Sequence, residues 1–389
     1  MPESPAPSFS LVSGGLCYRV AHALRLVRGD GNYDWWFPAL IVALAWVPLI
    51  ALGIVERKIT GHSIPLLAGY GVHARLLVAI PLFFVAESSL HMRTQRCIDR
   101  FIRGDWAVEG EATVARVTGW ATRWRDAITP EIILLVVGML GSQAILQGMG
   151  ASIDVVRGPH LASRWSPAAV WYGFVALPIY QFLAYRWLWR WGLWSWVLWK
   201  LSRLHLRPMA THPDLQGGLG FLSEPAAGFA FVLLGLNFVQ AAVWADRVLF
   251  EHVSVMLFKS PLAVLVVACV AVALGPLLVF ARPLWRARFD AVRAYDRLAT
   301  DYTRLFHARW IEDPRRDGLL GTPDLQSLAD LGNSYDVIRR MRVVPIGARA
   351  IAIIVAAVVI PMIPLVLMQV PLMELVRKLG AIALGGLPG

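Results

Sequence analysis

Four side chains with the chemistry of metal ligands fall near the ends of predicted helices. Glu87 and His91 lie one helical turn apart, so both can face one site. His212 and Asp214 lie in a later loop that is predicted to be on the same side of a membrane. Carboxylate and imidazole groups suit zinc and related metals. These four residues are the candidate metal ligands. Two alternatives stay open, because Asp214 equally suits a turn acceptor and Glu87 an ion pair with an arginine of the loop that follows it.

His212 and Asp214 belong to a glycine-rich segment that runs His212-Pro213-Asp214-Leu215-Gln216-Gly217-Gly218-Leu219-Gly220-Phe221-Leu222. Gly217, Gly218 and Gly220 permit a tight turn and close backbone approach. Exposed N–H groups in such a turn could bind an anion such as phosphate. The alternative is a turn that lets the following helix pack closely. This alternative is favoured, because no strand precedes the glycines and no complete phosphate-loop or dinucleotide fingerprint is present.

A second motif lies about a hundred residues later, at Thr322-Pro323-Asp324-Leu325-Gln326-Ser327-Leu328-Ala329-Asp330-Leu331-Gly332-Asn333-Ser334-Tyr335. Its polar positions are Asp324, Gln326, Asp330 and Asn333. Together the two motifs resemble those of a family of uncharacterised bacterial polytopic inner-membrane proteins, which carry HPDxxGGLGFL-like and DLQSLADLGNS-like elements. The resemblance spans most of the chain. It implies a multi-pass protein of the bacterial inner (cytoplasmic) membrane, and brings no established activity or ligand.

The composition is that of a membrane protein. Apolar residues make up 57% of the chain and charged residues 16%, with a mean hydropathy of +0.57, whereas about a quarter of a soluble domain is charged. The net charge is +11, and the Lys and Arg residues that produce it lie beside apolar stretches. Anionic lipid headgroups are therefore the expected counterions. Nucleic acid is not a predicted partner. The three cysteines are scattered and give neither a disulfide framework nor a zinc spacing.

Seven apolar stretches are each about long enough to cross a bilayer. They cover Trp35–Val55, Tyr70–Leu90, Ile132–Gln147, Ala168–Tyr185, Ala226–Ala245, Pro261–Ala281 and Ile351–Val370. Of the 37 Lys and Arg residues, 28 fall in the odd-numbered flanking segments, counted from the N-terminus. Because positive residues stay in the cytoplasm, the N-terminus is predicted inside and the C-terminus outside. We therefore predict an all-α polytopic membrane protein with seven transmembrane helices.

The prediction divides the chain into four parts. They are a cytoplasmic N-terminal segment (1–34), helices 1 to 6 (35–281) with cytoplasmic loops 91–130 and 186–225, a cytoplasmic helical layer (282–348), and helix 7 with a short external tail (349–389). Helices 4 to 7 thus have cytoplasmic extensions. In the layer, apolar residues every three or four positions predict an amphipathic helix over Leu284–Trp310 that continues the sixth span. Six tryptophans between Arg186 and Leu206 favour burial of that extension against protein over a position among headgroups.

The last span carries Pro361 and Pro364, which should kink it. A kinked membrane helix needs partners for its freed carbonyls, so it should be buried in the bundle or line a cavity. Val358, Pro361, Leu365 and Gln369 share one face at spacings of three and four, and they are the candidate pore-lining residues. A packing face has the same spacing, so this alternative also stays open.

The predicted topology is similar to that of the insect odorant and gustatory receptor channels. The likeness is architectural: seven helices, an inside N-terminus, an outside C-terminus and cytoplasmic helical extensions. It implies a tetramer whose subunits meet through those extensions and whose final helix lines a central pore. The lipid bilayer and further copies of the chain are the partners that follow from this resemblance.

Three classes of function fit the sequence. The first is an oligomeric ion channel, with helix 7 lining the pore and the cytoplasmic helices forming the assembly surface. A non-catalytic scaffold or sensor, the second, would need only the cytoplasmic helices. The third is a membrane enzyme with a cytoplasmic-face metal or phosphate site at the candidate ligands. No H-E-x-x-H, GxSxG or Cys–His pattern supports an enzyme, and we predict no catalytic residue and no cofactor.

Overall fold

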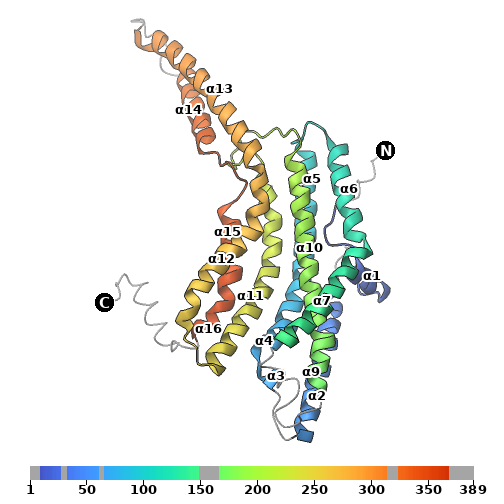
Figure 1. Cartoon of the computed structure of the whole chain (residues 1–389). Helices are drawn as coiled ribbons and strands as arrows, with labels where there is room; N and C mark the ends of the chain where they lie inside the picture. The colour runs from blue at the N-terminus through green and yellow to red at the C-terminus, as the bar shows by residue number, and fades with distance from the viewer. Residues whose placement is uncertain (1–8, 28–32, 61–64, 149–165, 313–322, 368–389) are drawn as a thin grey trace, which may run out of the picture.

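The computed structural model describes residues 9–27, 33–60, 65–148, 166–312 and 323–367, and its elements there are helices (Figure 1). Within these ranges the strand-type pairings are two isolated bridges, Val27 with Tyr33 and Ala107 with Leu206. Six helices are long and apolar enough to cross a membrane, and seven if one bent pair counts as a span. The predicted all-helical class is confirmed, and six or seven of the helical segments are candidate membrane spans.

The elements follow the predicted stretches closely. The first half comprises α1 (Leu16–Ala23), α2 (Trp36–Thr60), α3 (Pro65–Ala68), α4 (Tyr70–His73), η1 (Ala74–Ala79), α5 (Ile80–Arg103), α6 (Glu111–Asp126) and α7 (Ile128–Gly148). The second half comprises α9 (Pro167–Trp171), η3 (Tyr172–Ala176), α10 (Leu177–Ser202), η4 (Gly220–Ser223), α11 (Glu224–Phe250), η5 (Val255–Phe258), α12 (Lys259–Leu274), η6 (Gly275–Phe280), α13 (Ala281–His307), η7 (Ala308–Glu312), α14 (Pro323–Arg340), α15 (Ala348–Val359), η8 (Ile360–Met362) and α16 (Ile363–Leu367).

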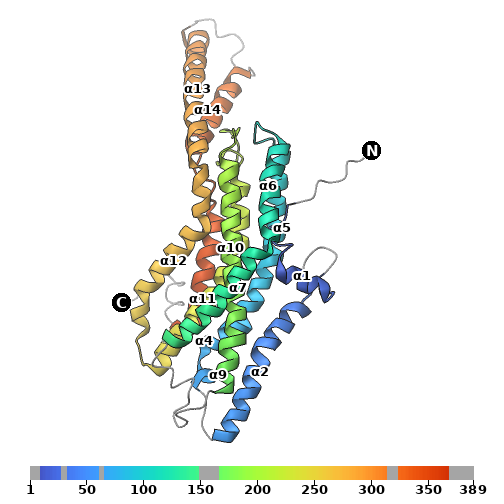
Figure 2. The same ribbon diagram turned by 45° about the vertical axis from the view of Figure 1, so that its right-hand side comes forward.

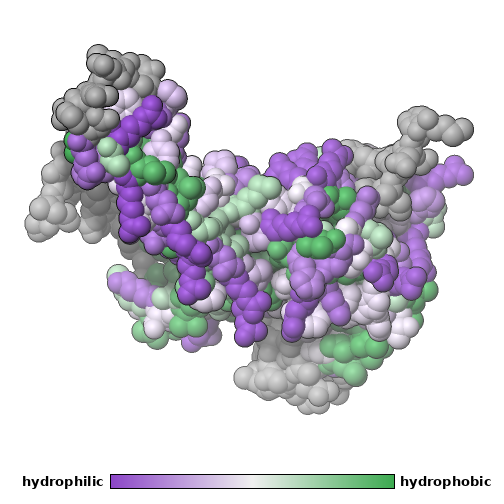
Figure 3. Space-filling view, turned by 90° about the horizontal axis from the view of Figure 1, so that it is seen from above, coloured by the Kyte–Doolittle hydropathy of each residue, from purple (hydrophilic) through white to green (hydrophobic). Residues whose placement is uncertain are grey.

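The segments rich in Lys and Arg lie toward one end of the bundle, at the top of Figures 1 and 2. We call this the α13 end, because α13 and α14 project from it as a hairpin. Hydrophilic residues cover much of the surface seen from this end (Figure 3). The alternation of charge along the sequence thus corresponds to a sorting of charge in space. The predicted side of the membrane for each terminus stays a prediction.

Helix α10 extends well past its apolar span and is buried by protein, as the tryptophan pattern favours. It packs against α6 and α7, and Trp187 and Trp194 are buried. Trp196 stacks on Trp120 of α6 with ring centroids 3.8 Å apart. The α6–α7 pair bends by 46°, since Ala127 between the two helices has an extended backbone.

In the segment that the sequence predicts as a helical layer (282–348), α13 and α14 form a hairpin (Figure 1). Helix α13 continues the sixth span through the 3-10 segment η6, in one run of 58 residues from Val255 to Glu312. Asp324 joins the two arms of the hairpin: its carboxylate accepts from Nε1 of Trp310 at 3.1 Å and pairs with Arg309 at 3.1 Å. The second sequence motif therefore has a structural role at Asp324.

The last helix breaks where its prolines predict. Between α15 and α16 lies the 3-10 turn η8, which contains Pro361. The broken helix packs against α11 and α12 through one face, whereas Ile351, Ile360 and Ile363 on the rest of its surface are exposed.

Small residues let α11 approach α5 closely. A Cβ on Gly228 would lie 3.1 Å from Cα of Leu90, and one on Gly235 would lie 3.3 Å from Cα of Ala79. Close backbone approach of this kind stabilises helix pairs in membranes by van der Waals contact. The packing of α11 against α5 therefore depends on Gly228, and its packing against the end of η1 on Gly235.

Replacing Gly228 by alanine should destabilise the bundle by about 1–3 kcal/mol, because the added methyl group overpacks the α5–α11 contact. Thermal unfolding of the purified protein in detergent measures the change. Gly192→Ala in α10 is the matched control, because a Cβ there has no heavy atom within 4 Å. Equal melting temperatures for the two variants would contradict the close packing.

Candidate functional site

Four charged side chains meet inside the bundle and form what we call the buried cluster: Glu87 of α5, Glu131 of α7, and Arg186 and Arg190 of α10. Nη2 of Arg186 donates to Oε1 of Glu87 at 2.8 Å, and Nη1 of Arg190 lies 3.0 Å from the same oxygen. Nε of Arg186 lies 3.8 Å from Oε1 of Glu131. All four side chains are at most 5% exposed. Desolvating four charges is costly, so such a cluster within candidate spans is a functional-site candidate.

Aromatic and thiol groups close the cluster on the side of the first span. The hydroxyl of Tyr33 accepts from Nη2 of Arg186 at 3.4 Å, and its ring stacks on Phe37 at 5.2 Å. Burial raises the pKa of Tyr33 and that of Cys17. Both groups are therefore neutral at physiological pH and add no charge to the cluster.

The N-terminal segment, residues 9–27, contacts the cluster and the side chains beside it. The carbonyl of Val12 accepts from Nη2 of Arg190 at 3.1 Å, and the backbone N–H of Leu16 donates to Oε2 of Glu131. Oγ of Ser10 lies 2.7 Å from Nδ1 of His91, and the carbonyl of Ser10 accepts from Arg125. The sequence predicted only a cytoplasmic N-terminal segment here, and the structure shows that its backbone groups hydrogen-bond with Arg190 and Glu131.

Several buried polar atoms in and beside the cluster have no hydrogen-bond partner in the part of the chain that the structure describes. Among the described residues, Oε2 of Glu87, Nε and Nη1 of Arg186 and Nε1 of Trp189 make no hydrogen bond, and Nη1 of Arg190 is not aligned for one despite its short distance to Glu87. A small cavity of about 10 Å³ lies between these groups and Leu11 of the N-terminal segment. A space of this size holds about one water molecule. The N-terminal segment thus leaves no room for a larger ligand.

Polar side chains continue from the cluster along α10 toward the opposite end of the bundle. Nη1 of Arg75 donates to the hydroxyl of Tyr172 at 2.8 Å, and Nε2 of Gln143 donates to the carbonyl of Gly173 at 3.3 Å. Gln181 is buried, and its Oε1 accepts no hydrogen bond from a described residue. The 14 residue steps from Tyr172 to Arg186 correspond to roughly 21 Å of helix, which is about two thirds of a hydrocarbon core.

Two π-helical segments face each other at the far end of this polar column. Arg75 belongs to η1 and Tyr172 to η3, and both segments are π-helical. π-helical turns are rare and often accompany functional sites. The polar column therefore ends at the two π-helical segments η1 and η3, which are joined by the Arg75–Tyr172 hydrogen bond. Its other end is the buried cluster.

The four predicted metal ligands do not form one site. Glu87 pairs with Arg186 and Arg190 of α10, not with an arginine of the loop that follows it, and His91 contacts serines of the N-terminal segment. His212 and Asp214 lie in the glycine turn and contact each other. Among the described residues, no group of three or more His, Cys, Asp or Glu side chains is placed to hold a metal ion.

The carboxylate of Asp214 organises the glycine turn from within. It accepts hydrogen bonds from the backbone N–H groups of Gln216 (2.8 Å), Gly218 (3.0 Å) and Gly220 (3.1 Å). Nδ1 of His212 lies 2.9 Å from the carboxylate and 3.3 Å from the backbone N of Asp214. Partial burial raises the pKa of Asp214, but the hydrogen bonds outweigh it and hold the pKa below its usual range. The N–H groups are thus taken, which favours the turn over an anion site.

Two of the glycines are required by geometry. Gly217 and Gly218 have φ values of +66° and +83°, and a Cβ on Gly218 would lie 2.1 Å from the ring of Trp106. The glycine motif therefore seats Trp106 and orders the loop that joins α10 to α11.

The predicted pore face points into the chain. Val358, Pro361 and Leu365 are all buried, and α15 packs there against α11 and α12. Gln369 lies outside the described residues. Of the other motif residues, Gln326 and Asp330 bond each other on the surface of α14 at 2.9 Å, and Asn333 is exposed.

Sequence reasoning missed the arginine partners of Glu87 and the role of Glu131. Neither Arg186 nor Arg190 was assigned a partner from the sequence. Their sequence signal is their position, since they directly follow an apolar span and lie four residues apart on one helical face.

Comparison of the chain with protein-family models, with curated proteins and with solved structures gives no match. The resemblances based on the two motifs and on the topology therefore stay predictions.

Replacing Glu87 by glutamine should lower the stability of the bundle by about 3–5 kcal/mol, because it leaves two buried arginines without their shared carboxylate. Thermal unfolding in detergent measures this loss. Glu251→Gln is the control: it breaks an exposed i,i+4 pair with Arg247, which contributes at most about 0.5 kcal/mol. The double variant Glu87→Gln/Arg190→Gln should recover part of the loss. A melting temperature for Glu87→Gln equal to that of Glu251→Gln would refute the cluster.

Replacing Asp214 by asparagine should make the amides of Gly218 and Gly220 exchange with solvent about 10–100 times faster, because charge-assisted hydrogen bonds are lost. Hydrogen exchange followed by mass spectrometry measures this, with Asp330→Asn on α14 as the control. In the unmodified protein the pKa of Asp214 is lowered, so protection should persist above the ordinary value of about 3.9 and be lost as pH falls through the folded-state pKa. Unchanged exchange in Asp214→Asn would contradict the role of the carboxylate.

Proposed function

We propose that this chain is a multi-pass membrane transport protein that conducts a small anion through the polar column between α10, α5 and α7. The observation that carries the proposal is the buried cluster of Glu87, Arg186 and Arg190. Ionisable residues within membrane spans are rare and mark substrate or ion pathways. In this proposal the α13 end faces the cytoplasm of a bacterial inner membrane, in accord with the distribution of Lys and Arg.

An anion is favoured by the charges along the column. Arg75, Arg186 and Arg190 line it, against the carboxylates of Glu87 and Glu131. Arg125 borders the same small cavity, although its charge is paired with Asp126 at 2.8 Å. Nε and Nη1 of Arg186 make no hydrogen bond with a described residue, so these donors remain available to an anion. Pores for anions are lined by such cationic side chains.

The described conformation corresponds to a closed state in this proposal. The N-terminal segment occupies the α13 end of the column and contacts Arg190, Glu131 and His91. A space of about 10 Å³ is too small for a permeant anion. Conduction therefore requires the N-terminal segment to leave, which places the gate on the cytoplasmic side and the path within one chain. The path differs from the pore that the last helix was expected to line.

Removing residues 2–15 should open the column. In proteoliposomes, iodide entry measured with an encapsulated fluorescent dye should rise at least tenfold over the full-length protein, whereas potassium flux should not rise. Adding Arg75→Gln to the truncated protein should lower the iodide flux, because it removes the cation at the far end of the column. Arg247→Gln is the matched control, since Arg247 is exposed and pairs with Glu251.

Absence of iodide flux in the truncated protein, with a normal helical circular dichroism spectrum, would refute transport. It would favour the second candidate, a non-catalytic scaffold. One observation supports this candidate: the projecting hairpin carries exposed apolar side chains, with Leu298 52%, Leu305 71% and Leu325 46% exposed. Exposed apolar groups on a cytoplasmic arm are typical of surfaces that contact another protein.

A further inference from the structure

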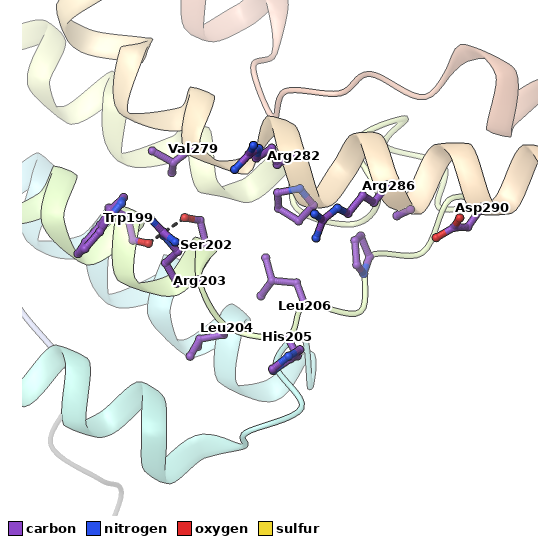
Figure 4. Close-up of a pocket in the computed structure, with 13 residues that line it drawn as sticks. Trp199, Ser202, Arg203, Leu204, His205, Leu206, Val279, Arg282, Arg286 and Asp290 are labelled. Atoms are coloured by element: carbon purple, nitrogen blue, oxygen red, sulfur yellow. Dashed lines mark hydrogen bonds between the residues drawn. The ribbon is translucent and has the colours of Figure 1, made fainter.

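A second polar feature lies on the surface at the α13 end, apart from the buried cluster. It is a groove of about 660 Å³ between the end of α10, the loop that follows it, and the beginning of α13 (Figure 4). Arg282 and Arg286 come from α13, Trp199 from α10, and Leu206 and Pro208 from the loop. Figure 4 shows Arg286 extending into the space between α13 and the loop that carries Leu206.

The groove holds more positive than negative charge. Arg203, Arg282 and Arg286 line it and are exposed, and among the described residues no carboxylate pairs with Arg282 or Arg286. Arg203 lies over the ring of Trp199 at 5.3 Å. Asp290 is the single carboxylate among the described lining residues. Unpaired arginines gathered in one concave site favour a ligand with two or more anionic oxygens, which the guanidinium fork can bind in a bidentate manner.

The groove straddles the boundary between the apolar and the charged parts of the chain. Val279, at one end of its lining, belongs to the apolar segment η6 that follows α12. Arg282 begins the charged part only three residues later. Trp285 and Phe289 stack beside the groove at 5.2 Å and are exposed. Aromatic rings and arginines at such a boundary are typical of the headgroup level of a bilayer.

The loop wall of the groove is fixed by its own contacts. The backbone N–H of Arg207 donates to the carbonyl of Trp106 at 2.9 Å, and that of Val108 donates to the carbonyl of His205 at 2.9 Å. The carboxylate of Glu109 accepts from the backbone N–H of His205 at 3.0 Å and lies 2.7 Å from Nδ1 of the same residue. The groove is therefore formed before a ligand binds, which lowers the entropic cost of binding.

We propose that this groove binds the phosphate headgroup of an anionic phospholipid of the surrounding bilayer. The phosphate lies between Arg282, Arg286 and Arg203, and the glycerol and the upper acyl chain lie along Val279 and Leu206. Basic sites between membrane helices on the cytoplasmic side bind anionic headgroups in this way. A free phosphate ion would use the arginines but not the apolar wall. The combination of both therefore assigns the site to a lipid, independently of any transport through the buried cluster.

The test compares lipid binding by two double variants of the full-length protein. Arg282→Gln/Arg286→Gln removes the groove cations, and Arg293→Gln/Arg297→Gln removes equal charge from the same helix outside the groove lining. Phosphatidylglycerol and phosphatidylcholine are titrated into the detergent-purified protein, and bound lipid is counted by native mass spectrometry. We expect the groove variant to bind phosphatidylglycerol about 30-fold more weakly than the unmodified protein, and the control to bind it within about twofold.

Three outcomes would overturn the proposal. Equal weakening in both double variants would show only general attraction to positive charge. Equal affinity of the unmodified protein for phosphatidylglycerol and phosphatidylcholine would show that the phosphate charge is not recognised. Competition by inorganic phosphate or glycerol phosphate at the concentration where the lipid binds would assign the site to a soluble anion.

A second measurement removes the dependence on a folded variant. Hydrogen exchange of the unmodified protein in nanodiscs should show slower exchange over 202–208 and 279–290 with phosphatidylglycerol than with phosphatidylcholine alone, and no difference over α14. Protection that is absent from both stretches would overturn the site as well.

Discussion

The ion pairs of Glu87 with Arg186 and Arg190 are the constraint on which the rest of the bundle depends. Two guanidinium groups at most 4% exposed cannot stay in the interior without a carboxylate. Their burial therefore fixes α5 against α10 and brings Glu131 of α7 into the same place. It also explains why a segment ahead of the first span folds back into the bundle. Main-chain groups of that segment satisfy charges that the helices leave partly unpaired.

Local patterns were sufficient to predict most of the helices. Long apolar stretches, the amphipathic repeat from Leu284 to Trp310, and the prolines of the last span each act over a few turns, so the sequence reveals them directly. The same holds for the glycine turn, because Gly217 and Gly218 adopt a positive φ that other residues rarely reach. These elements match the structure because their causes are local.

The candidate site could not be predicted because its causes are not local. Glu87 and Arg186 are 99 residues apart in the sequence, and nothing in either neighbourhood specifies the other. The groups of the N-terminal segment that hydrogen-bond with Arg190 and Glu131 are backbone groups. No particular residue type is needed to supply them, so the sequence does not reveal them. The face of Val358, Pro361 and Leu365 was ambiguous for a related reason. A helix face at spacings of three and four packs equally well against the same chain or a pore, and only the neighbours α11 and α12 decide it.

Helix α10 carries both kinds of arginine and shows why they differ. Arg186 is 2% exposed and its partner is a carboxylate of the same chain, because a buried charge must be neutralised as the protein folds. Arg203, near the end of the helix, is exposed and lies on Trp199, and water meets its needs without a carboxylate. It is therefore free to serve an external anion together with Arg282 and Arg286. The position of an arginine along this helix thus sets its exposure to solvent. Buried arginines stabilise the fold, and exposed arginines are available to a ligand.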